Sequence, residues 1–572
     1  MAPPVSPPTN AELADLFEEI GDLLEIQGEN PFKVRAYRRA AEVLRELPQP
    51  AAALDPAELR FIPGIGEAIA AKIVERVSTG SLAFLDRLHQ QIPPSVRELV
   101  RVPGIGPKTA ARLLKNGIVS RQGLEAALAD GRLARLLGPT LSERIARGLL
   151  AAEPQSSRAD LLRATEGAAL ARLRVERLPG VQRVEVAGSL RRFAERVGDV
   201  NLAASATDPQ QAAAALHATV AGAERVEPEE VRFPADGLTV AVRFAPPAAF
   251  GSLWQWWTGS RAHNEALRER AGQRGLSLGR YGIAPPEAVG FATEEALYHA
   301  LGLAWIPPEL REARGEIERA ACGQLPTLVT VEALRGDLHV HTDWSDGVAS
   351  LEAMVAAAAA RGYEYLAITD HSAGRAVARG LDRERLMAQI QRVRHYNETH
   401  PDGPLVLVGA EVDIRADGTL DYPDDLLRQL DVVVASVHSA LDQPREKMTA
   451  RLVAAARHPL VTLLGHPTGR LIGRRDPVAV DLEAVLAACA ANGTWVEINA
   501  HPARLDLNDE HARLAREMGV RLVINCDAHA PDHFGLARYG VAVARRAWLG
   551  PQEIVNTAPR ALFLRHLEER RR

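Results

Sequence analysis

Histidine and acidic side chains recur at the ends of apolar runs in the C-terminal part of the chain. Thirteen of the 17 histidines lie at or after His339. His339 and His341 stand two residues apart, a spacing that puts both side chains on one face of a strand, and Asp346 follows them. Each of the remaining six side chains comes at the end of an apolar run that predicts a β-strand: His371, Glu411, His438, His466, Asp527 and His529.

These nine groups predict a cluster of bound metal ions. From Gly336 onward strand and helix patterns alternate, which favours parallel strands joined by crossover helices. In a (β/α) barrel the carboxyl ends of the strands meet at one mouth. Nine nitrogen and oxygen ligands are too many for one ion, so we expect two or three. The donor set lacks thiolates, which favours Mn²⁺ and would also suit Zn²⁺ or Fe²⁺. Such ions can activate water and clamp a phosphate.

Two segments near the N-terminus repeat the same glycine turn. Residues 61–72 and 102–112 each contain Pro-Gly-Ile-Gly between two helical patterns. Glycine permits positive φ and leaves backbone N–H groups at the start of the next helix open to a phosphate. The repeat therefore predicts contacts with the DNA backbone that do not read bases. The predicted DNA-binding residues are Gly64, Gly66, Lys72, Gly104, Gly106 and Lys108.

A third group of polar residues surrounds a glycine–serine turn in the mixed α/β region that follows. The strand predicted at 181–187 runs into Gly188 and Ser189, and Arg192 lies in the helix after them. A glycine–serine turn at a helix start, beside an arginine, suits a triphosphate.

These motifs together resemble the family X DNA polymerases, in the bacterial form with a C-terminal PHP (polymerase and histidinol phosphatase) domain. The resemblance rests on the two glycine turns, Gly-Ser-Leu-Arg-Arg at 188–192, Gly-Asp-Val-Asn at 198–201 and Trp-Thr-Gly-Ser-Arg-Ala-His-Asn at 257–264. It implies that Gly188, Ser189 and Arg192 hold an incoming deoxynucleoside triphosphate. The other implied nucleotide-binding residues are Trp256, Trp257 and Gly259 at the sugar, and Asn264 and Arg268 at the nascent base pair.

The chain departs from the family pattern at the polymerase metal site. That pattern has two aspartates two residues apart on a strand and a third on a neighbouring strand. Here Asp199 is retained, but Asn201 and Ala241 occupy the other two positions. Nucleotidyl transfer needs carboxylates to hold two ions. We therefore expect an impaired polymerase centre, with Asp199 left as a residual ligand that holds Mg²⁺ or Mn²⁺ poorly.

Lys72 is open to two interpretations. It stands where the family's deoxyribose-phosphate lyase lysine would form a Schiff base. Neighbouring cations and desolvation could lower its pKa enough for that chemistry. A phosphate contact is the interpretation we favour.

At the C-terminal end, every ligand position of the PHP pattern is filled. The resemblance implies one metal site made by His339, His341, Glu411 and Asp527, a second by Glu411 with His438 and His466, and a third by Asp346, His371 and His529. The implied catalytic residues are Asp346, His371, Glu411 and Asp527. The implied activity is 3′–5′ exonuclease action on DNA.

The length of 572 residues, or 61.9 kDa, predicts several domains. The expected fold is an α-helical helix-hairpin-helix region, an α+β nucleotidyltransferase-like palm and a PHP-type distorted (β/α) barrel. The predicted boundaries are 1–85 and 86–155 for two helical domains with one glycine turn each, 156–250 for the palm, 251–318 for a thumb-like subdomain that binds the nucleotide and base pair, 319–334 for a linker and 335–572 for the PHP domain.

Composition narrows the class of protein. With a net charge of −5, the chain as a whole is not a polycation that coats nucleic acid. Three cysteines without a Cys-x-x-Cys pair do not suit a disulfide scaffold. The N-terminus does not read as a signal peptide, and apolar stretches are too short to span a membrane. We expect a cytoplasmic, nucleoid-associated monomer that acts on gapped, nicked or 3′-recessed DNA.

Three functions are compatible with these patterns. The first is a DNA-repair exonuclease whose polymerase region holds DNA without extending it efficiently. The second is an active gap-filling polymerase with an exonuclease. The third is a DNA-binding scaffold whose barrel hydrolyses a small phosphoester.

Overall fold

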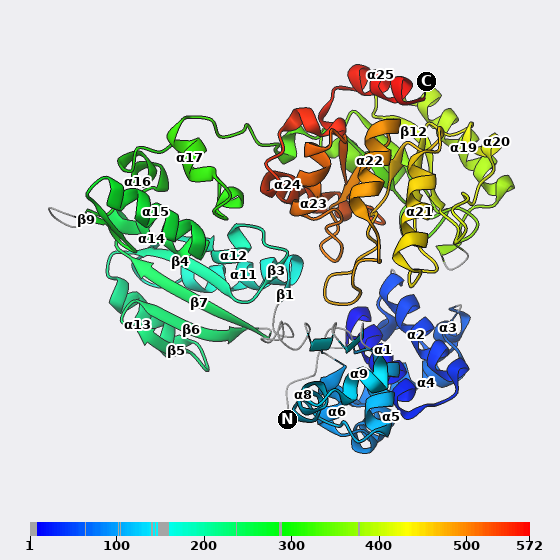
Figure 1. Cartoon of the computed structure of the whole chain (residues 1–572), viewed down its shortest axis with the longest axis horizontal. Helices are drawn as coiled ribbons and strands as arrows, with labels where there is room; N and C mark the ends of the chain where they lie inside the picture. The colour runs from blue at the N-terminus through cyan, green and yellow to red at the C-terminus, as the bar shows by residue number, and fades with distance from the viewer. Residues whose placement is uncertain are drawn as a thin grey trace. The chain divides into compact units, whose positions relative to one another are not determined.

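A computed structural model of the chain describes residues 8–47, 49–62, 64–100, 102, 105–138, 141–142, 145–146, 159–235, 237–284, 289–375 and 378–571. The chain divides into two compact units, Met1–Ser156 and Ser157–Arg572 (Figure 1). Each unit is described by itself below. The predicted fold class, with a helical front, an α+β middle and a (β/α) barrel, is confirmed.

The first unit is helical throughout its described residues. Apolar side chains from its helices, among them Leu13, Phe17, Ile73 and Leu113, form a core separate from the cores of the second unit. The helices are α1 (Asn10–Gln27), α2 (Pro31–Glu46), α3 (Pro56–Phe61), α4 (Glu67–Thr79), α5 (Ala83–Gln91), α6 (Pro94–Leu99), α7 (Pro107–Lys115), α8 (Arg121–Ala129) and α9 (Arg132–Leu137), with a 3₁₀ turn at Ala51–Ala53.

The second unit begins with a five-stranded mixed sheet in the order β2-β4-β7-β6-β5. Helices α11 (Leu161–Glu176) and α13 (Pro209–Thr219) share one core with the sheet, and α14 (Phe250–Thr258) packs on Ala187, Ala203 and Ala245 in another. Since successive side chains of a strand point to opposite faces, Asn201 and Ala203 share the face that α14 covers. The strands are β2 (Val181–Ala187), β4 (Val200–Ala206), β5 (Glu224–Glu227), β6 (Glu230–Ala235) and β7 (Leu238–Ala245); β1 (Ala159–Asp160) pairs with β3 (Arg196–Val197), and the short helix α12 spans Gly188–Arg191.

A smaller helical region follows the sheet. Its core includes Leu267, Leu297, Tyr298 and Ile306. A buried carboxylate, Glu294, accepts hydrogen bonds from the guanidinium groups of Arg191 and Arg311 and so ties this region to the sheet. The elements are α15 (Arg261–Gln273), β8 (Ser277–Gly279), β9 (Gly282–Ala284), α16 (Glu294–Ala300) and α17 (Glu316–Ala321), with 3₁₀ turns at Pro247–Ala249, Pro308–Leu310 and Val331–Ala333.

The barrel has seven parallel strands in sequence order. Its edge strands meet through a parallel bridge between Val340 and Ala528, where His341 N donates to Ala528 O at 2.8 Å. The strands are buried on both faces and mostly apolar, as is usual for parallel strands under crossover helices. They are β10 (Gly336–Val340), β11 (Tyr365–Ile368), β12 (Leu405–Asp413), β13 (Val432–Ser436), β14 (Leu463–Leu464), β15 (Trp495–Asn499) and β16 (Leu522–Asn525).

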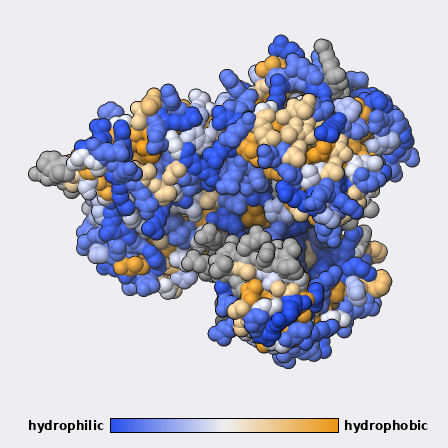
Figure 2. Space-filling view, in the orientation of Figure 1, coloured by the Kyte–Doolittle hydropathy of each residue, from blue (hydrophilic) through white to orange (hydrophobic). Residues whose placement is uncertain are grey.

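Helices surround these strands (Figure 1). They are α18 (Leu351–Ala360), α19 (Arg383–Thr399), α20 (Asp424–Leu427), α21 (Arg445–Ala456), α22 (Leu482–Asn492), α23 (Asp509–Glu517), α24 (Ala537–Arg546) and α25 (Arg560–Arg571), with 3₁₀ turns at Pro531–Leu536, Pro551–Glu553 and Val555–Thr557. Figure 2 shows pale apolar colour over α22, whose exposed residues include Ala484, Ala487 and Ala490. No helix among the described residues is long and apolar enough to span a bilayer.

Ion pairs join the barrel to the α+β region within the second unit. Arg546 of α24 donates to Glu312 Oε1 and to the carbonyl oxygen of Arg192, both at 2.9 Å. Arg470 pairs with Glu195 at 2.9 Å. The barrel therefore contacts the backbone of the residue that is predicted to bind a triphosphate.

Candidate metal centre

The barrel brings all nine predicted ligand residues to one mouth. His339 lies in β10 and Glu411 in β12, and the other seven follow the ends of β10, β11, β13, β14 and β16. His339 and His341 are fully buried, and their ring centroids lie 5.1 Å apart. The spacing of two residues on a strand has put both imidazoles on one face, as predicted.

Glu411 lies at the middle of the cluster. Its Oε1 is 2.9 Å from His466 Nε2 and 3.2 Å from His438 Nε2. Its Oε2 is 2.9 Å from His371 Nδ1 and 3.4 Å from His339 Nε2. One carboxylate with a different imidazole set on each oxygen is suited to bridge two ions.

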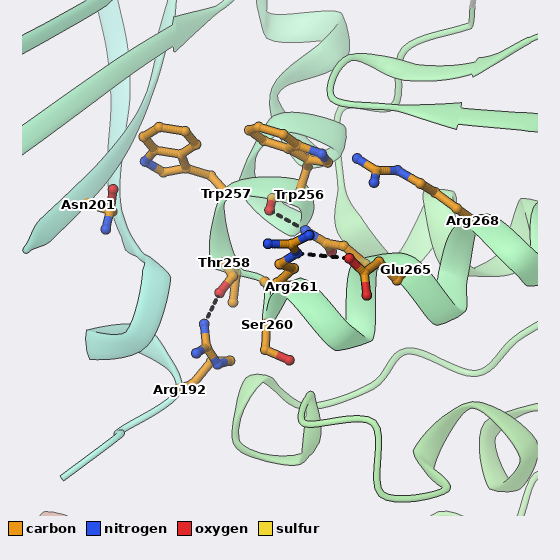
Figure 3. A pocket seen from close by; sticks show the side chains of 11 residues that line it. Arg192, Asn201, Trp256, Trp257, Thr258, Ser260, Arg261, Glu265 and Arg268 are labelled. Atoms are coloured by element: carbon orange, nitrogen blue, oxygen red, sulfur yellow. Dashed lines mark hydrogen bonds and ion pairs between the residues drawn. The ribbon is translucent and has the colours of Figure 1, made fainter. Parts of the chain in front are cut away.

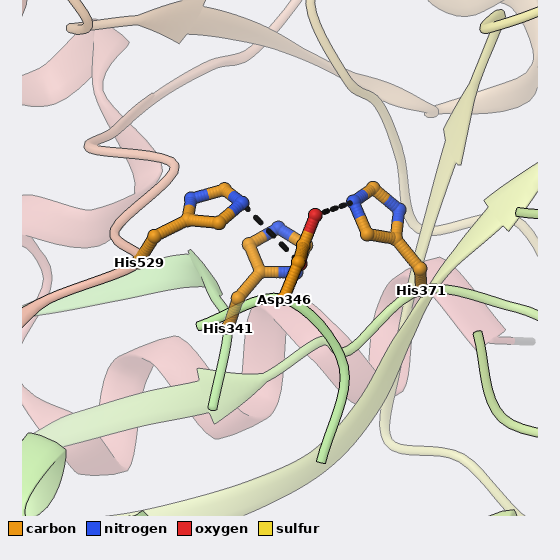
Figure 4. A group of neighbouring side chains, drawn as sticks. All are labelled: His341, Asp346, His371 and His529. Carbon is orange, nitrogen blue, oxygen red and sulfur yellow. Dashed lines mark ion pairs between the residues drawn. The ribbon is translucent and has the colours of Figure 1, made fainter. Parts of the chain in front are cut away.

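Asp346 is the corresponding acid at the outer side of the cluster. Its Oδ2 lies 3.3 Å from His371 Nε2, and its Oδ1 lies 3.4 Å from His529 Nε2. Figure 4 shows this carboxylate between the two imidazoles, with His341 beside it. The side chain of His529 is 30% exposed, which opens this side of the cluster to solvent.

The ligand atoms form four overlapping groups, in each of which all atoms lie within 4.8 Å of one another. The groups are His341, Asp346, His371 and His529; His339, Glu411 and His466; His339, His341 and Asp527; and His371, Glu411 and His438. Three of them correspond in outline to the three predicted sites. The difference is that His438 and His466 fall in separate groups, although both lie against Oε1 of Glu411, so the division of the nine residues among ions stays a prediction.

The residues fit metal ions because several buried ligand atoms have no hydrogen-bond partner within the protein. Leaving a buried polar atom unpaired costs about 1–3 kcal/mol. Such atoms occur here on five of the nine residues, namely His339 Nε2, both ring nitrogens of His341, His371 Nδ1, both oxygens of Glu411 and His466 Nδ1. Bound cations would satisfy those of the atoms that face the cluster.

Charge is balanced within the cluster by protons when no ion is bound. Burial alone would lower the pKa of His371, but Glu411 and Asp346 raise it to about 10. Asp346 and Asp527 similarly raise the pKa of His529 to about 9 against the effect of burial. Burial would raise the pKa of Glu411, yet the surrounding imidazolium groups hold it well below its usual range. Metal ions would take the place of these protons.

Two ligand residues have unusual backbone conformations. The φ angles of His466 and Asp527 are 26° and 52°, in the left-handed region that non-glycine residues seldom adopt. Both residues come directly after short buried strands. The positive φ turns the chain sharply at the point where it delivers the ligand.

Three further buried carboxylates support the ligands, and the sequence interpretation missed them. Glu497 of β15 accepts from His339 Nδ1 at 2.7 Å and from the backbone N–H of His466 at 2.7 Å. Asp413 accepts from His438 Nδ1 at 2.5 Å. Asp370 accepts from Thr342 N at 2.8 Å and so fixes the loop that carries Asp346. Such partners set the tautomer and orientation of a ligating imidazole.

A second candidate site lies in the α+β region. Figure 3 shows a pocket of about 400 Å³ between α14, α15 and the end of the sheet. Six of the eight predicted nucleotide-binding residues line it: Arg192, Trp256, Trp257, Gly259, Asn264 and Arg268. Gly188 and Ser189 do not line it directly, but a Cβ at Gly188 would lie 2.7 Å from the side chain of Asn201, which does.

Two of the polar side chains of this pocket, Arg192 and Asn264, are already engaged with protein groups. Arg192 donates to the carbonyl oxygen of Thr258, and its Nε donates to Glu312 at 3.1 Å. Asn264 donates to Trp256 O at 2.7 Å. A triphosphate would therefore have to compete for these two donors of Arg192 or use its remaining N–H groups.

The two residues that depart from the polymerase pattern lie side by side on neighbouring strands. Asn201 of β4 and Ala241 of β7 are direct partners in the parallel ladder. Ala241 is 1% exposed, and Asp199 is exposed just before β4. Asp199 belongs to none of the groups of potential metal ligands found among the described residues. The expectation of an impaired polymerase centre stays a prediction.

The glycine turns of the first unit open to solvent. Gly66 and Gly106 are the N-caps of α4 and α7, without a side-chain capping bond, and a Cβ at either would meet nothing within 4 Å. Gly64 has a φ of 102°. Lys108 extends into solvent with 87% of its side chain exposed. The predicted contact at Gly104 lies outside the described residues.

Lys72 lies between aromatic rings and cations. Its Nζ is 4.9 Å from the ring centroid of Phe84 and donates to Ala68 O at 3.1 Å. Partial burial, together with the charges of Lys33 and Arg87, lowers the pKa of its ammonium group. This environment is compatible with both a phosphate contact and a Schiff base, so both interpretations stay predictions.

Four family descriptions match the chain. They are "Helix-hairpin-helix domain" at residues 8–82, "SAM-like Helix-hairpin-helix tandem" at 96–151, "DNA polymerase beta thumb" at 253–312 and "PHP domain" at 337–501. The helix-hairpin-helix and thumb matches indicate that the chain binds DNA, and the PHP match indicates a metal-dependent barrel. The span of the PHP match includes seven of the nine ligand residues.

Curated relatives extend these matches. "Probable phosphatase" of Acetivibrio thermocellus is 30% identical over 208 residues, 35% of this chain and 81% of that protein. "Probable phosphatase Teth39_0577" of Thermoanaerobacter pseudethanolicus is 30% identical over 166 residues, 27% of this chain and 65% of that protein. "DNA polymerase/3′-5′ exonuclease PolX" of Bacillus subtilis is 33% identical over 557 residues, which cover 95% of this chain and 97% of that protein. A match along nearly the whole of both chains confirms the predicted resemblance and shows that this protein belongs to the bacterial PolX family, with a PHP domain at its C-terminal end.

Proposed function

We propose that this protein is a DNA-repair enzyme whose barrel hydrolyses the 3′-terminal phosphodiester of DNA. The observation that carries the proposal is the set of nine imidazole and carboxylate side chains at one mouth, with unpaired buried ligand atoms on five of them. The Bacillus subtilis relative is named a polymerase and 3′–5′ exonuclease, which agrees with a nuclease of this polarity.

Bound ions, with Mn²⁺ our first choice, would supply a hydroxide near neutral pH and neutralise the leaving oxygen. The residues of the chain then have three tasks. Glu411 holds imidazoles on both of its oxygens and keeps the cluster together. Glu497 fixes the orientation of His339. His529 has the most exposed side chain of the nine, and it marks the side on which a DNA end would enter.

The remaining regions would bring the DNA to the barrel. The open N–H groups after Gly66 and Gly106 suit backbone phosphates of gapped, nicked or 3′-recessed duplexes. The pocket lined by Trp256 and Trp257 would hold a terminal base or a deoxynucleoside triphosphate. With neutral side chains at Asn201 and Ala241, extension would be slow compared with trimming.

The test is one gel. A gapped duplex with a 5′-labelled primer is incubated with the full chain and Mn²⁺, with and without deoxynucleoside triphosphates. We expect shortening in both lanes, and we expect it to disappear in His339→Ala and Asp527→Asn but to persist in His395→Ala, an exposed histidine of α19. Metal-dependent trimming that survives in His339→Ala would refute the assignment of the barrel.

The same gel tests the second candidate function, a gap-filling polymerase, which the name of the Bacillus subtilis relative favours. Lengthening of the primer that is lost in Asp199→Ala would establish it. The matches to probable phosphatases favour a third candidate, turnover of a small phosphoester. Faster hydrolysis of a nucleotide monophosphate than of DNA, without stimulation by gaps, would establish that one.

A further inference from the structure

Three arginine side chains lie in loops at the mouth of the barrel, and one of them, Arg504, pairs with the ligand residue Asp527. Arg375 comes from the loop after β11, Arg475 from the loop after β14 and Arg504 from the turn after β15. These loops leave the carboxyl ends of parallel strands, so they surround the same opening as the metal centre.

Arg504 is the one nearest to the metal centre. Its Nε lies 3.6 Å from Asp527 Oδ2, and 20% of its side chain is exposed. Burial, followed by the charge of Arg504, lowers the pKa of His466 to about 4. A positive charge therefore stands directly beside two of the ligand residues.

Arg475 lies close enough to Arg504 and Arg375 for their positive charges to act on it. Arg475 is exposed, and its Nε donates to Gly469 O at 2.8 Å. Partial burial and then the charges of Arg504 and Arg375 lower its pKa, so Arg475 is repelled by both of the other guanidinium groups. Arg375 Nε is buried and has no hydrogen-bond partner.

Ordinary counter-charges are missing from this group. Within the part of the chain that the structure describes, neither Arg375 nor Arg475 has a carboxylate within 4.0 Å, the limit for an ion pair. Asp506 is the acid whose charge acts on Arg475, but its Oδ2 accepts from Thr468 N at 3.0 Å and from Thr468 Oγ1 at 2.9 Å. Gathering like charges is unfavourable unless an anion joins them, and the planar fork of arginine suits phosphate in particular.

We propose that Arg375 and Arg475, with Arg504 on the side of the metal centre, bind the DNA phosphate that precedes the scissile one. The inference rests on the proposed function, because the scissile phosphate itself would lie on the ions. Its consequence is a preference of the barrel for the end of a polynucleotide over an ester with a single phosphate.

The test changes the substrate and the protein together. The full chain with Mn²⁺ is given a 5′-labelled single-stranded trinucleotide, or the same trinucleotide with a neutral methylphosphonate at the linkage nearest its 5′ end. Loss of that one charge is expected to lower kcat/KM of the wild-type chain by about tenfold or more, the effect of a hydrogen bond to a charged group. Arg375→Gln and Arg475→Gln should lower kcat/KM on the unmodified trinucleotide by a similar factor.

The decisive measurement combines the arginine variants with the methylphosphonate substrate. On the methylphosphonate the arginine variants should lose no more than about a further twofold, because the partner of the arginines is already absent. Arg445→Gln is the control, since it removes an exposed arginine of α21 that pairs with Asp481 at 3.1 Å. It should behave as the wild-type chain does on both substrates.

The other possible outcomes separate failure of the phosphate subsite from failure of the proposed function. Equal trimming of both trinucleotides by the wild-type chain would overturn the subsite and leave the proposed function standing. A dinucleotide with a free 5′-hydroxyl has only the scissile phosphate. Arginine variants that lose as much on this dinucleotide would show that the side chains bind the scissile phosphate, and would overturn the subsite as well. A wild-type chain that trims neither trinucleotide would refute the proposed function, and the subsite with it.

Discussion

At the scale of single residues, the barrel depends on carboxylates that would not touch an ion. Glu497 is fully buried and accepts hydrogen bonds from His339, His466, Asn499 and Asn525. By accepting from Nδ1 of His339 it leaves Nε2 with the lone pair that a metal requires. The orientation of the His339 imidazole is thus set by Glu497, a residue that is not itself a ligand.

We expect Glu497→Gln to weaken metal binding by about 10–100-fold, the usual effect of removing such a partner. The reason is that a neutral amide accepts more weakly from His339 and does not fix its tautomer. Titration of the metal-free full chain with Mn²⁺ by calorimetry measures the change. Glu483→Gln, an exposed acid at the start of α22, is the control and should bind as the wild-type chain does. Unchanged affinity in Glu497→Gln would contradict the role given to this carboxylate.

Metal binding should release protons. His371 and His529, with pKa values raised to about 10 and about 9, are protonated near neutral pH in the metal-free chain, whereas a bound ion needs neutral imidazole. Affinity should therefore rise with pH toward 9 to 10. The sign is opposite for the stability of the metal-free chain: the contribution of these two histidines is complete below their ordinary pKa of 6.5 and is lost as pH rises through 9 to 10.

Calorimetry in buffers of different ionisation enthalpy measures this release directly. At pH 7.5 the apparent enthalpy of Mn²⁺ binding should depend on the buffer, and the dependence should be smaller in His371→Gln. An enthalpy that is the same in every buffer would show that no protons leave and would contradict the raised pKa values.

Single residues also show what the sequence could and could not predict. The clustering of the nine side chains was predictable, because six of them follow apolar runs whose ends meet in a parallel barrel, and His339 and His341 stand two residues apart on one strand face. Glu497 could have been found by the same reasoning, since Glu497 and Asn499 are polar residues two apart in an otherwise apolar strand. Arg375 and Arg475 could not, because loops of irregular shape carry them to the mouth and no spacing records where such loops end.

At the scale of elements, the strands β4 and β7 decide whether the α+β region can do metal chemistry. Their parallel pairing puts Asn201 directly opposite Ala241, with Asp199 two residues before Asn201. Side chains at 199 and 201 point to the same side of the strand. The backbone arrangement for three neighbouring carboxylates is therefore present, while two of the carboxylates are not.

We expect the double variant Asn201→Asp, Ala241→Asp to gain template-directed nucleotide addition of about 100-fold or more over the wild-type chain, because it restores the charge that two ions need. Primer extension on a gapped duplex, with the barrel silenced by Asp527→Asn in both chains, measures the gain. Asp199→Asn added to the double variant should abolish it. A double variant that melts as the wild-type chain does and still fails to extend would show that the pocket, and not its metal site, limits the polymerase.

The elements themselves were largely predictable. The apolar alternation at 181–187 predicted the strand observed as β2, and the apolar runs of the barrel predicted its parallel strands in order. β14 is only two residues long, Leu463–Leu464, although the apolar run extends from Val461 to His466. The difference arises because the chain turns early, at His466, to deliver an imidazole, which periodicity does not reveal.

At the scale of the whole molecule, the chain has two units with separate cores. Our proposal assigns the binding of duplex DNA to the glycine turns of the first and hydrolysis to the barrel of the second. The core of the first unit contains residues between Leu13 and Ile145, and the cores of the second contain residues from Ala159 onward. Because the described residues of the two units form no common apolar core, we expect each unit to fold by itself.

A chain that starts at Ala159 should therefore fold and keep its action on short single strands within about twofold of the full chain, since distant sites contribute independently. Its affinity for a gapped duplex should fall by about tenfold or more, because the phosphate contacts of the first unit are lost. Anisotropy with a labelled gapped duplex and trimming of a trinucleotide measure the two effects. Equal affinity of both chains for the duplex would contradict the role assigned to the glycine turns.

The positive φ angles of His466 and Asp527 have a consequence for how the barrel can change. A left-handed conformation costs a non-glycine residue about 1–2 kcal/mol, and glycine adopts it freely. At these two positions the backbone conformation favours glycine, which has no side chain to bind a metal ion. Selection for stability and selection for metal binding thus favour different residues at two of the nine positions. If metal binding were no longer under selection, we would expect substitutions that remove the strain to appear first at His466 and Asp527.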